Sequence, residues 1–149
     1  MRAVVQRVSH AKVTVDNETV GQIGPGLLVY AAAAPDDGDA DIAYIAEKVA
    51  HLRIFPDAEC KMNLSVADAR GSVLLVSAFT VQADARKGRR PSFDSSASGP
   101  VAEPLIAQLV AAVRAYGLPV ETGRFAAHML VESVNDGPIC VLLDSRRTF

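Results

Sequence analysis

The segment Ser72–Val81 limits the possible folds of this chain more than any other feature, because it is the most continuous apolar run in the sequence. A short apolar run bounded by turn residues is typical of a strand that is buried on both faces. A second run of this kind, Gly26–Ala32, follows a break at Gly24–Pro25. Two central strands need cover, so we expect a sheet with helices packed against it.

The residues before Gly26 indicate strands joined by a tight turn. Arg2–Ser9 alternates between its two faces in the manner of a strand. Lys12–Asp16 and Thr19–Ile23 then flank the turn residues Asp16–Glu18, which is a hairpin pattern. We therefore expect the chain to begin as an antiparallel meander.

Two segments have the apolar spacing of amphipathic helices. Acidic residues that favour a helix start precede Ile42, and apolar residues recur at helical spacing as far as Leu52, which predicts a helix over about 39–52. A second stripe runs over Val101–Tyr116, with Pro104 in its first turn and Gly117 as a suitable stop. The first stripe should cover one face of the sheet.

Further short strands are expected at Arg53–Pro56 and at 120–122, and two more at 129–134 and 139–143, joined through Asn135–Pro138. No internal repeat or linker interrupts this series. A chain of 149 residues is of ordinary size for one unit, so we expect a single domain spanning 1–149.

Composition excludes several classes of protein. Half of the residues are hydrophobic, which argues against disorder. No apolar run reaches the roughly 18–20 residues of a membrane helix, and Arg2, Gln6 and Arg7 interrupt the place where a signal peptide needs an apolar segment. We expect a soluble, cytoplasmic protein without membrane contact.

The cysteines and histidines offer no recognisable metal site. Cys60 and Cys140 are far apart and form no C-x-x-C pair, and His10, His51 and His128 are scattered without ligand spacing. We expect free thiols, no metal and no cofactor.

Basic residues are concentrated in one short run. The net charge of −2 argues against a protein that is held on nucleic acid by its overall charge. Four basic residues nevertheless lie within five positions: Arg86, Lys87, Arg89 and Arg90. Such a run indicates either a solvated loop or a local contact with phosphates.

Gly137–Pro138 separates two apolar runs in what is otherwise a strand pattern. Glycine permits backbone angles closed to other residues and proline has no amide proton, so the pair leaves carbonyl groups without a ladder partner. A hairpin turn is the ordinary interpretation of Asn-Asp-Gly-Pro, and a functional backbone element is the alternative. Either isomer of the bond fits the pattern.

Several motifs follow one another in a fixed order along the chain: Met1–Val8, Leu52–Phe55, Lys61–Ser65, Lys87–Phe93, Thr122–Phe125, Val134–Pro138 and Leu143–Ser145. With these motifs, the sequence resembles the D-aminoacyl-tRNA deacylase family over essentially its whole length. The resemblance implies an α+β fold with mostly antiparallel, barrel-like β-sheets flanked by two main helices.

The resemblance also implies hydrolysis of the ester that joins a D-amino acid to the terminal adenosine of tRNA. The enzyme is implied to be a homodimer with its active site at the subunit interface. In this family the Gly-Pro pair, here Gly137–Pro138, is held cis and reaches into the partner's pocket, where its backbone excludes L-amino acids. The basic residues of the run 86–90 become candidate contacts for tRNA phosphates.

Ser77–Val81 resembles the family's other signature, usually Ser-Gln-Phe-Thr-Leu, which implies a catalytic segment of Ser77, Ala78, Phe79 and Thr80. The alternative is that the two hydroxyls bond nearby backbone groups and that the ring packs inside. Ala78 stands where glutamine is usual, so we expect the backbone at Ala78 and Phe79 to polarise the ester. Phe79 is expected to pack near the adenosine, and Ser77 and Thr80 to order the pocket. Cys140 likewise stands where threonine is usual.

No histidine lies beside Ser77 or Thr80 in the sequence, and the resemblance implies that the 2′-hydroxyl of the substrate takes part instead. Phe125 and Met129 are candidate pocket residues, and they are equally good core residues.

Three other functions stay open. A thiol hydrolase would use Cys140 with His128, and a non-catalytic RNA-binding module would use the basic run alone. A related deacylase with the opposite Gly-Pro isomer would prefer L-substrates. Ser77 and Phe79 fit the D-specific type better.

Overall fold

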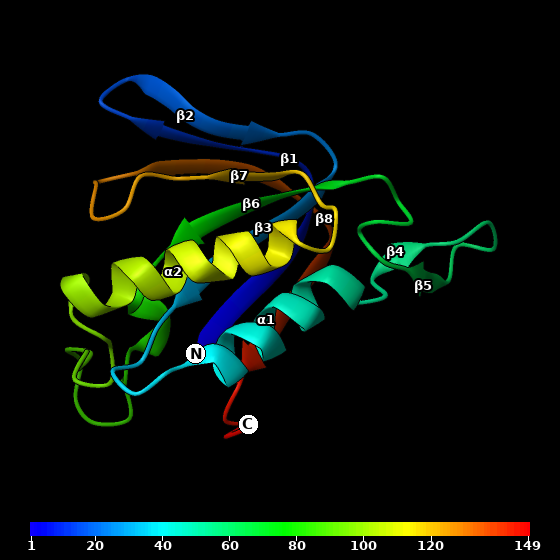
Figure 1. Ribbon diagram of the computed structural model, residues 1–149. Helices are drawn as coiled ribbons and strands as arrows, with labels where there is room; N and C mark the ends of the chain where they lie inside the picture. The colour runs from blue at the N-terminus through cyan, green and yellow to red at the C-terminus, as the bar shows by residue number, and fades with distance from the viewer.

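The computed structural model describes all residues, 1–149 (Figure 1). Its main sheet has six strands in the order β2-β1-β3-β6-β7, with β8 paired to β1. The strands of this sheet are β1 (Arg2–Val15), β2 (Glu18–Ile23), β3 (Gly26–Ala32), β6 (Ser72–Ser77), β7 (Val120–Thr122) and β8 (Leu130–Asp144). The remaining elements are α1 (Asp39–His51), α2 (Gly99–Arg114), the two-stranded sheet of β4 (Phe55–Pro56) and β5 (Met62–Leu64), and the 3₁₀ turn η1 (Phe79–Gln82).

β1 organises the main sheet, because it is long enough to pair with three strands. Its first half, Arg2–Val8, pairs with β3, its second half, Ala11–Val15, pairs with β2, and β8 runs antiparallel along it. β3 therefore lies beside β1 and not beside β2, and the expected simple meander is wrong. The first half of β1 does not pair with β2, so the backbone groups along that edge are free to pair with β3.

The two helices make the long connections of the sheet. Strands β3, β6 and β7 are mutually parallel neighbours, which requires such crossovers. Figure 1 shows α1 and α2 side by side on one face of the sheet. Neither helix is long and apolar enough to cross a membrane.

The sheet curls until its two ends approach each other. β2 and β7 end the strand order, yet a Cβ atom added to Gly21 would lie only 2.4 Å from the carbonyl oxygen of Thr122. This near closure confirms the predicted α+β fold of mostly antiparallel, barrel-like sheets with two main helices.

The core has two parts. The larger part, 25 buried residues, lies between the sheet and the helices and includes Leu75, Ile45 and Leu109. The smaller part, 8 buried residues, lies on the opposite face of the sheet and includes Val13 and Leu74. The central strands are thus covered on both faces, as their apolar sequences predict.

Two boundaries differ from the sequence prediction. β6 ends at Ser77, because β3 ends at Ala32 and the parallel ladder has no further partner beyond Ala78. β8 is one strand rather than two joined by a turn, because its residues pair with β1 on both sides of a bulge at Gly137–Pro138. The hairpin interpretation of Asn135–Pro138 is therefore wrong.

Candidate active site

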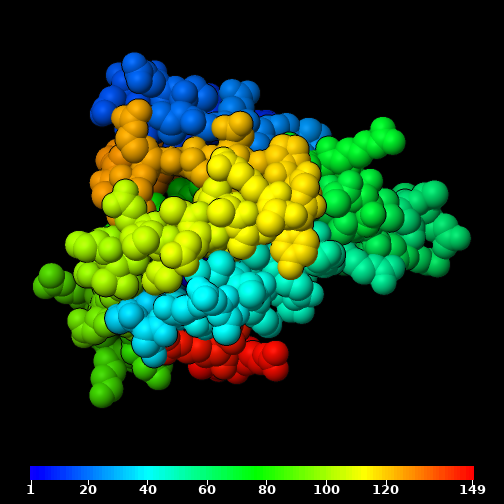
Figure 2. Space-filling view, viewed as in Figure 1, coloured from blue at the N-terminus to red at the C-terminus, as the bar shows by residue number.

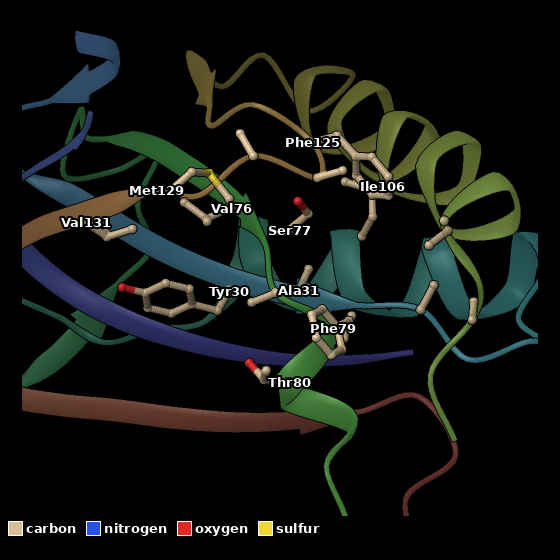
Figure 3. A pocket seen from close by; sticks show the side chains of 18 of the residues that line it. Tyr30, Ala31, Val76, Ser77, Phe79, Thr80, Ile106, Phe125, Met129 and Val131 are labelled. Carbon is tan, nitrogen blue, oxygen red and sulfur yellow. The ribbon is translucent and has the colours of Figure 1, made fainter. Parts of the chain in front are cut away.

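A cavity of about 520 Å³ opens where β3 and β6 end, between the start of α2 and the segment that follows β7 (Figure 3). Most of its lining is hydrophobic. The lining residues to which sequence analysis had already assigned a role are Ser77, Ala78, Phe79, Thr80, Phe125 and Met129. The structure thus brings the predicted catalytic segment and both predicted pocket residues to one place.

The end of β6 positions the predicted catalytic segment. The N–H of Ala78 donates to the carbonyl oxygen of Ala31 at 2.9 Å, so this donor belongs to the sheet. The chain then turns sharply into η1, which begins at Phe79. The first N–H groups of a helix have no acceptor within it, which leaves the Phe79 and Thr80 N–H groups as the backbone donors of this segment.

The side chains of this segment differ in exposure. Ser77 is half-buried and lies among the cavity side chains in Figure 3, whereas Thr80 is exposed at the rim. The Phe79 ring is 58% exposed, so the interpretation of Phe79 as a core residue is wrong. Its edge-to-face partner is Phe93, with ring centroids 5.1 Å apart.

The turn after β7 supplies Phe125 and Met129. Met129 packs so closely that a Cβ atom on Gly123 would lie 2.5 Å from its sulfur, so a side chain at position 123 would have to displace that of Met129. Ala126, at the tip of the turn, has a left-handed backbone with φ of 57°. Phe125 also borders a second hollow of about 310 Å³, which Figure 2 shows between α2 and this segment.

Sequence analysis missed several lining residues, among them Tyr30, Ile106 and Val131. Burial raises the pKa of the Tyr30 hydroxyl, so this group stays a neutral donor at neutral pH. A hydroxyl near the end of an otherwise apolar strand was the available signal for Tyr30, as it was for Ser77.

Gly137–Pro138 does not line this cavity. The Gly137–Pro138 peptide bond is cis, and both residues are exposed. In the β1–β8 ladder Gln6 pairs with Cys140 and Val8 pairs with Asn135, so the four residues between them bulge opposite Arg7. Ala3 pairs with Ala31 at the cavity, which places the bulge roughly 13 Å further along β1 at about 3.3 Å per residue.

Two side chains hold the bulge. The Asn135 amide closes its base, accepting from the Ile139 N–H at 2.8 Å and donating to the Ile139 carbonyl oxygen at 3.2 Å. Arg7, 9% exposed, donates to the carbonyl oxygens of Asp136 at 3.1 Å and Ile54 at 2.6 Å. Sequence analysis missed the role of Arg7, although a cation in a covered strand was a usable signal.

The basic run forms an exposed loop beside the cavity, visible in green at the lower left of Figure 1. Asp84 and Ser92 close its base through two backbone hydrogen bonds of 2.8 and 2.9 Å. Arg86 pairs with Asp84 at 2.6 Å, and hydrogen bonds from Arg86 hold the pKa of that carboxyl well below its usual range. Lys87, Arg89 and Arg90 make no ion pair.

The pair required by a thiol hydrolase is not assembled. His128 lines the cavity, but Cys140 lies outside it, next to Gln6 at 3.8 Å. Cys140 and Cys60 are free and exposed. No group of three or more His, Cys, Asp or Glu side chains is arranged to hold a metal ion.

The chain is similar to known proteins along nearly its whole length. Residues 4–144 match the family described as D-Tyr-tRNA(Tyr) deacylase. The chain is 56% identical to the D-aminoacyl-tRNA deacylase of Symbiobacterium thermophilum, covering 100% of this chain and 99% of that one. It is 53% identical to the D-aminoacyl-tRNA deacylase of Thermosipho africanus, covering 100% of both.

Two solved structures share the fold. One, described as c-Myc DNA Unwinding Element Binding Protein, has a TM-score of 0.91 and 34% identity over 97% of this chain and 98% of that one. The other, a probable eukaryotic D-amino acid tRNA deacylase, has a TM-score of 0.80 and 20% identity over 95% of this chain and 97% of that one. The match over residues 4–144 and the identities above 50% place this chain in the D-Tyr-tRNA(Tyr) deacylase family, a family of enzymes.

Proposed function

We propose that this enzyme hydrolyses D-aminoacyl-tRNA in the cavity at the end of β6, and that Gly137–Pro138 of a second subunit rejects L-substrates there. The observation that carries the proposal is the convergence of Ser77, Phe79, Phe125 and Met129 on one cavity in a member of this family. The chain acts as one domain. Because the substrate is a tRNA, we expect the activity in the cytoplasm.

The size and polarity of the cavity suit the end of such a substrate. Its volume of about 520 Å³ lies within the range of roughly 300–1,000 Å³ found for small-ligand sites. Its apolar lining suits an adenine ring and the ester, and the exposed Phe79 ring offers a stacking surface. Stacking of an unpaired base on an aromatic side chain contributes about 1–3 kcal/mol.

The chemistry does not depend on a protein base beside Ser77. Water adds to the ester carbonyl carbon, the bond to the ribose oxygen breaks, and that oxygen takes a proton, which yields free tRNA and a D-amino acid. We assign the proton transfer to the 2′-hydroxyl of the terminal ribose. The Phe79 N–H stabilises the developing oxyanion, since the Ala78 N–H is already bound to Ala31.

A second copy of the chain brings Gly137–Pro138 to the cavity. Within one chain the pair lies away from the cavity, so it acts on a substrate only across an interface. β8 has an unpaired outer edge and exposes the large apolar side chains Leu130, Val134 and Leu142. A long apolar edge strand of this kind is normally covered, and a homodimer would cover it.

The basic loop is the proposed contact for tRNA phosphates. Lys87, Arg89 and Arg90 are exposed and unpaired, so they can neutralise phosphates without breaking an internal ion pair. Arg86 contributes less, because it already pairs with Asp84. If these contacts form, tRNA affinity should fall as salt concentration rises.

A non-catalytic nucleic-acid-binding module is the rival function. One structural neighbour is described as a DNA unwinding element binding protein, and the basic loop beside two exposed aromatic rings suits a single strand of nucleic acid. The deep apolar cavity at the end of β6 is not needed for that function, which favours the deacylase. A deacylase that prefers L-substrates would carry the opposite Gly-Pro isomer, whereas the Gly137–Pro138 bond is cis in this chain.

The test is deacylation of matched D- and L-tyrosyl-tRNA by the purified chain. We expect release of D-tyrosine only, and much slower release when the terminal 2′-hydroxyl is replaced by hydrogen. Binding without release would support the nucleic-acid-binding module, and equal rates on both enantiomers would exclude chiral selection. An unchanged rate on the 2′-deoxy substrate would exclude the proposed role of the 2′-hydroxyl.

A further inference from the structure

Phe93 is a large aromatic side chain at the cavity mouth that has no role in the function proposed above. It packs edge-to-face on Phe79, with centroids 5.1 Å apart and an interplanar angle of 72°, and it is still 38% exposed. The Phe79 ring, at 58% exposure, is even more open. Two adjacent rings are therefore presented to solvent at the place where a strand of nucleic acid would enter.

The backbone fixes this aromatic pair. Ser92, just before Phe93, exchanges two backbone hydrogen bonds with Asp84, and the Phe93 carbonyl oxygen accepts from the Ser96 N–H at 2.9 Å. The Ser96 hydroxyl also donates to the Phe79 carbonyl oxygen at 2.9 Å. The short segment 92–96 thus carries one aromatic residue and hydrogen-bonds to the backbone of the other. These bonds fix the positions of the two residues relative to each other.

A third hollow lies beside Phe93. It has a volume of about 500 Å³, and its walls are Arg90, Pro91, Ser92, Phe93 and Asp94. The walls carry one cation, Arg90, and one carboxylate, Asp94, so their charges cancel. Walls without net charge suit an uncharged base better than a phosphate. The unpaired cations Lys87 and Arg89 belong to the same loop and remain available for the backbone phosphates.

We propose that Phe93 stacks the base of the nucleotide that precedes the terminal adenosine, while Phe79 receives the adenosine itself. Alternation of aromatic rings with cations is the usual way in which proteins hold single-stranded nucleic acid. The inference rests on the proposed function for the identity of the strand. It adds a contact that would let the enzyme distinguish a tRNA end from a free aminoacyl nucleoside.

The test compares two unacylated probes, adenosine monophosphate and a cytidylyl-cytidylyl-adenosine trinucleotide, in binding to wild type and Phe93→Leu. Loss of one stacked base corresponds to a loss of affinity of roughly 5- to 150-fold. We expect this loss for the trinucleotide and less than about twofold for the monophosphate, since the latter has no preceding base. Phe93→Tyr, which keeps the ring, should retain trinucleotide affinity.

Tyr116 provides a matched control. It is also an exposed aromatic residue with an edge-to-face partner, His51 at 5.0 Å, but it lies outside the cavity. Tyr116→Leu should bind both probes as wild type does. Equal losses for both probes in Phe93→Leu would mean that Phe93 merely supports Phe79, and no loss for either would also overturn the proposal.

Hydrolysis separates this inference from the proposed function. Wild-type hydrolysis of D-tyrosyl-tRNA tests the deacylase activity on a substrate that carries the preceding nucleotide. If D-tyrosyl-tRNA is not hydrolysed but Phe93→Leu still weakens binding of the trinucleotide alone, the deacylase proposal fails and the stacking role of Phe93 stands.

Discussion

The cavity at the end of β6 and the bulge at Gly137–Pro138 are built in opposite ways. The cavity is lined by residues from four parts of one chain, and the sheet core fixes them. The bulge is exposed, projects from the paired part of β8 and does not line the cavity of its own chain. One region is complete in a single chain, whereas the role proposed for the other requires a second copy.

This contrast separates two tasks. Binding and polarising the ester needs preorganised groups, and those come from the ends of buried strands. Rejecting the wrong enantiomer needs a surface that the substrate must pass, and an exposed backbone element can provide one. Changes in the cavity should therefore affect both enantiomers, and changes at the bulge should affect the ratio between them.

Filling the cavity should have the largest effect. Ala102 lines the cavity from α2 and is half-buried, so the indole of Ala102→Trp would occupy the space for the substrate. We expect the rate on D-tyrosyl-tRNA to fall about a hundredfold or more, because even small displacements of a reacting group are costly. The measurement is kcat/KM for deacylation.

Ala111→Trp is the matched control, since Ala111 lies on the same helix, is exposed and does not line the cavity. This control should keep the wild-type rate. Near-normal deacylation by Ala102→Trp would mean that the ester is cleaved elsewhere.

Removing the support of the bulge should have an intermediate effect. In Arg7→Met the carbonyl oxygens of Asp136 and Ile54 lose a buried donor, which should lower the free energy of unfolding by about 1–3 kcal/mol. Urea denaturation measures this loss. The bulge would also be held less firmly, so discrimination against L-tyrosyl-tRNA should decrease more than the D rate does.

Lys12→Met serves as the control for Arg7, because Lys12 is a half-exposed cation on the same strand that pairs only with the exposed Glu132. It should change stability little. Loss of the D rate in Arg7→Met without loss of discrimination would contradict the division of tasks.

Relaxing the turn that holds Met129 should have a smaller effect. Ala126 has φ of 57°, a conformation that disfavours a Cβ atom, so Ala126→Gly should raise the free energy of unfolding by about 0.5–1 kcal/mol. Ala127→Gly, one residue on, should instead lower it by roughly the same amount. A loss of stability in Ala126→Gly would mean that the turn is not strained.

Acid should release the basic loop, with the smallest effect on the whole molecule. The pKa of Asp84 lies below its ordinary value because of hydrogen bonds from Arg86, so this carboxylate favours the folded loop at neutral pH. Because folding lowers this pKa, the stabilisation of the loop by the Asp84 carboxylate is complete above the ordinary pKa near 3.8. The stabilisation is lost as the pH falls through the lower pKa of the folded protein. The loop should therefore stay closed throughout the neutral range.

Carbon-detected NMR titration of the Asp84 carboxyl measures this shift. In Arg86→Gln the midpoint should rise toward the ordinary value. A midpoint that is the same in both proteins would show that Arg86 does not hold the loop.

The sequence predicted those features that depend on local pattern. The apolar runs and helical stripes led to the right elements, and the resemblance of Ser77–Val81 to the family signature led to the predicted catalytic segment. It did not reveal that β8 passes through Gly137–Pro138 as one strand, because that depends on pairing with a distant β1. Arg7 was missed for the same reason, since its acceptors lie 129 and 47 residues away.

The exposure of Cys140 and the engagement of the Ala78 N–H were also beyond the sequence. Both depend on which side of a strand faces solvent or a neighbouring strand, and a shift of one residue in register reverses that side. Local patterns therefore predicted the segments that carry candidate catalytic groups, and pairing between distant strands decided which of those groups are free to take part.

The most direct test of the account is a mixed dimer. One subunit carries Pro138→Ala with an open cavity, and the other carries Ala102→Trp with an intact Gly137–Pro138; two different affinity tags allow the mixed species to be purified. Only the intact Gly137–Pro138 of the other subunit can then reach the open cavity. We predict that this dimer hydrolyses D-tyrosyl-tRNA and rejects L-tyrosyl-tRNA, unlike the Pro138→Ala homodimer. Hydrolysis of L-tyrosyl-tRNA by the mixed dimer as fast as by that homodimer would contradict selection across the interface.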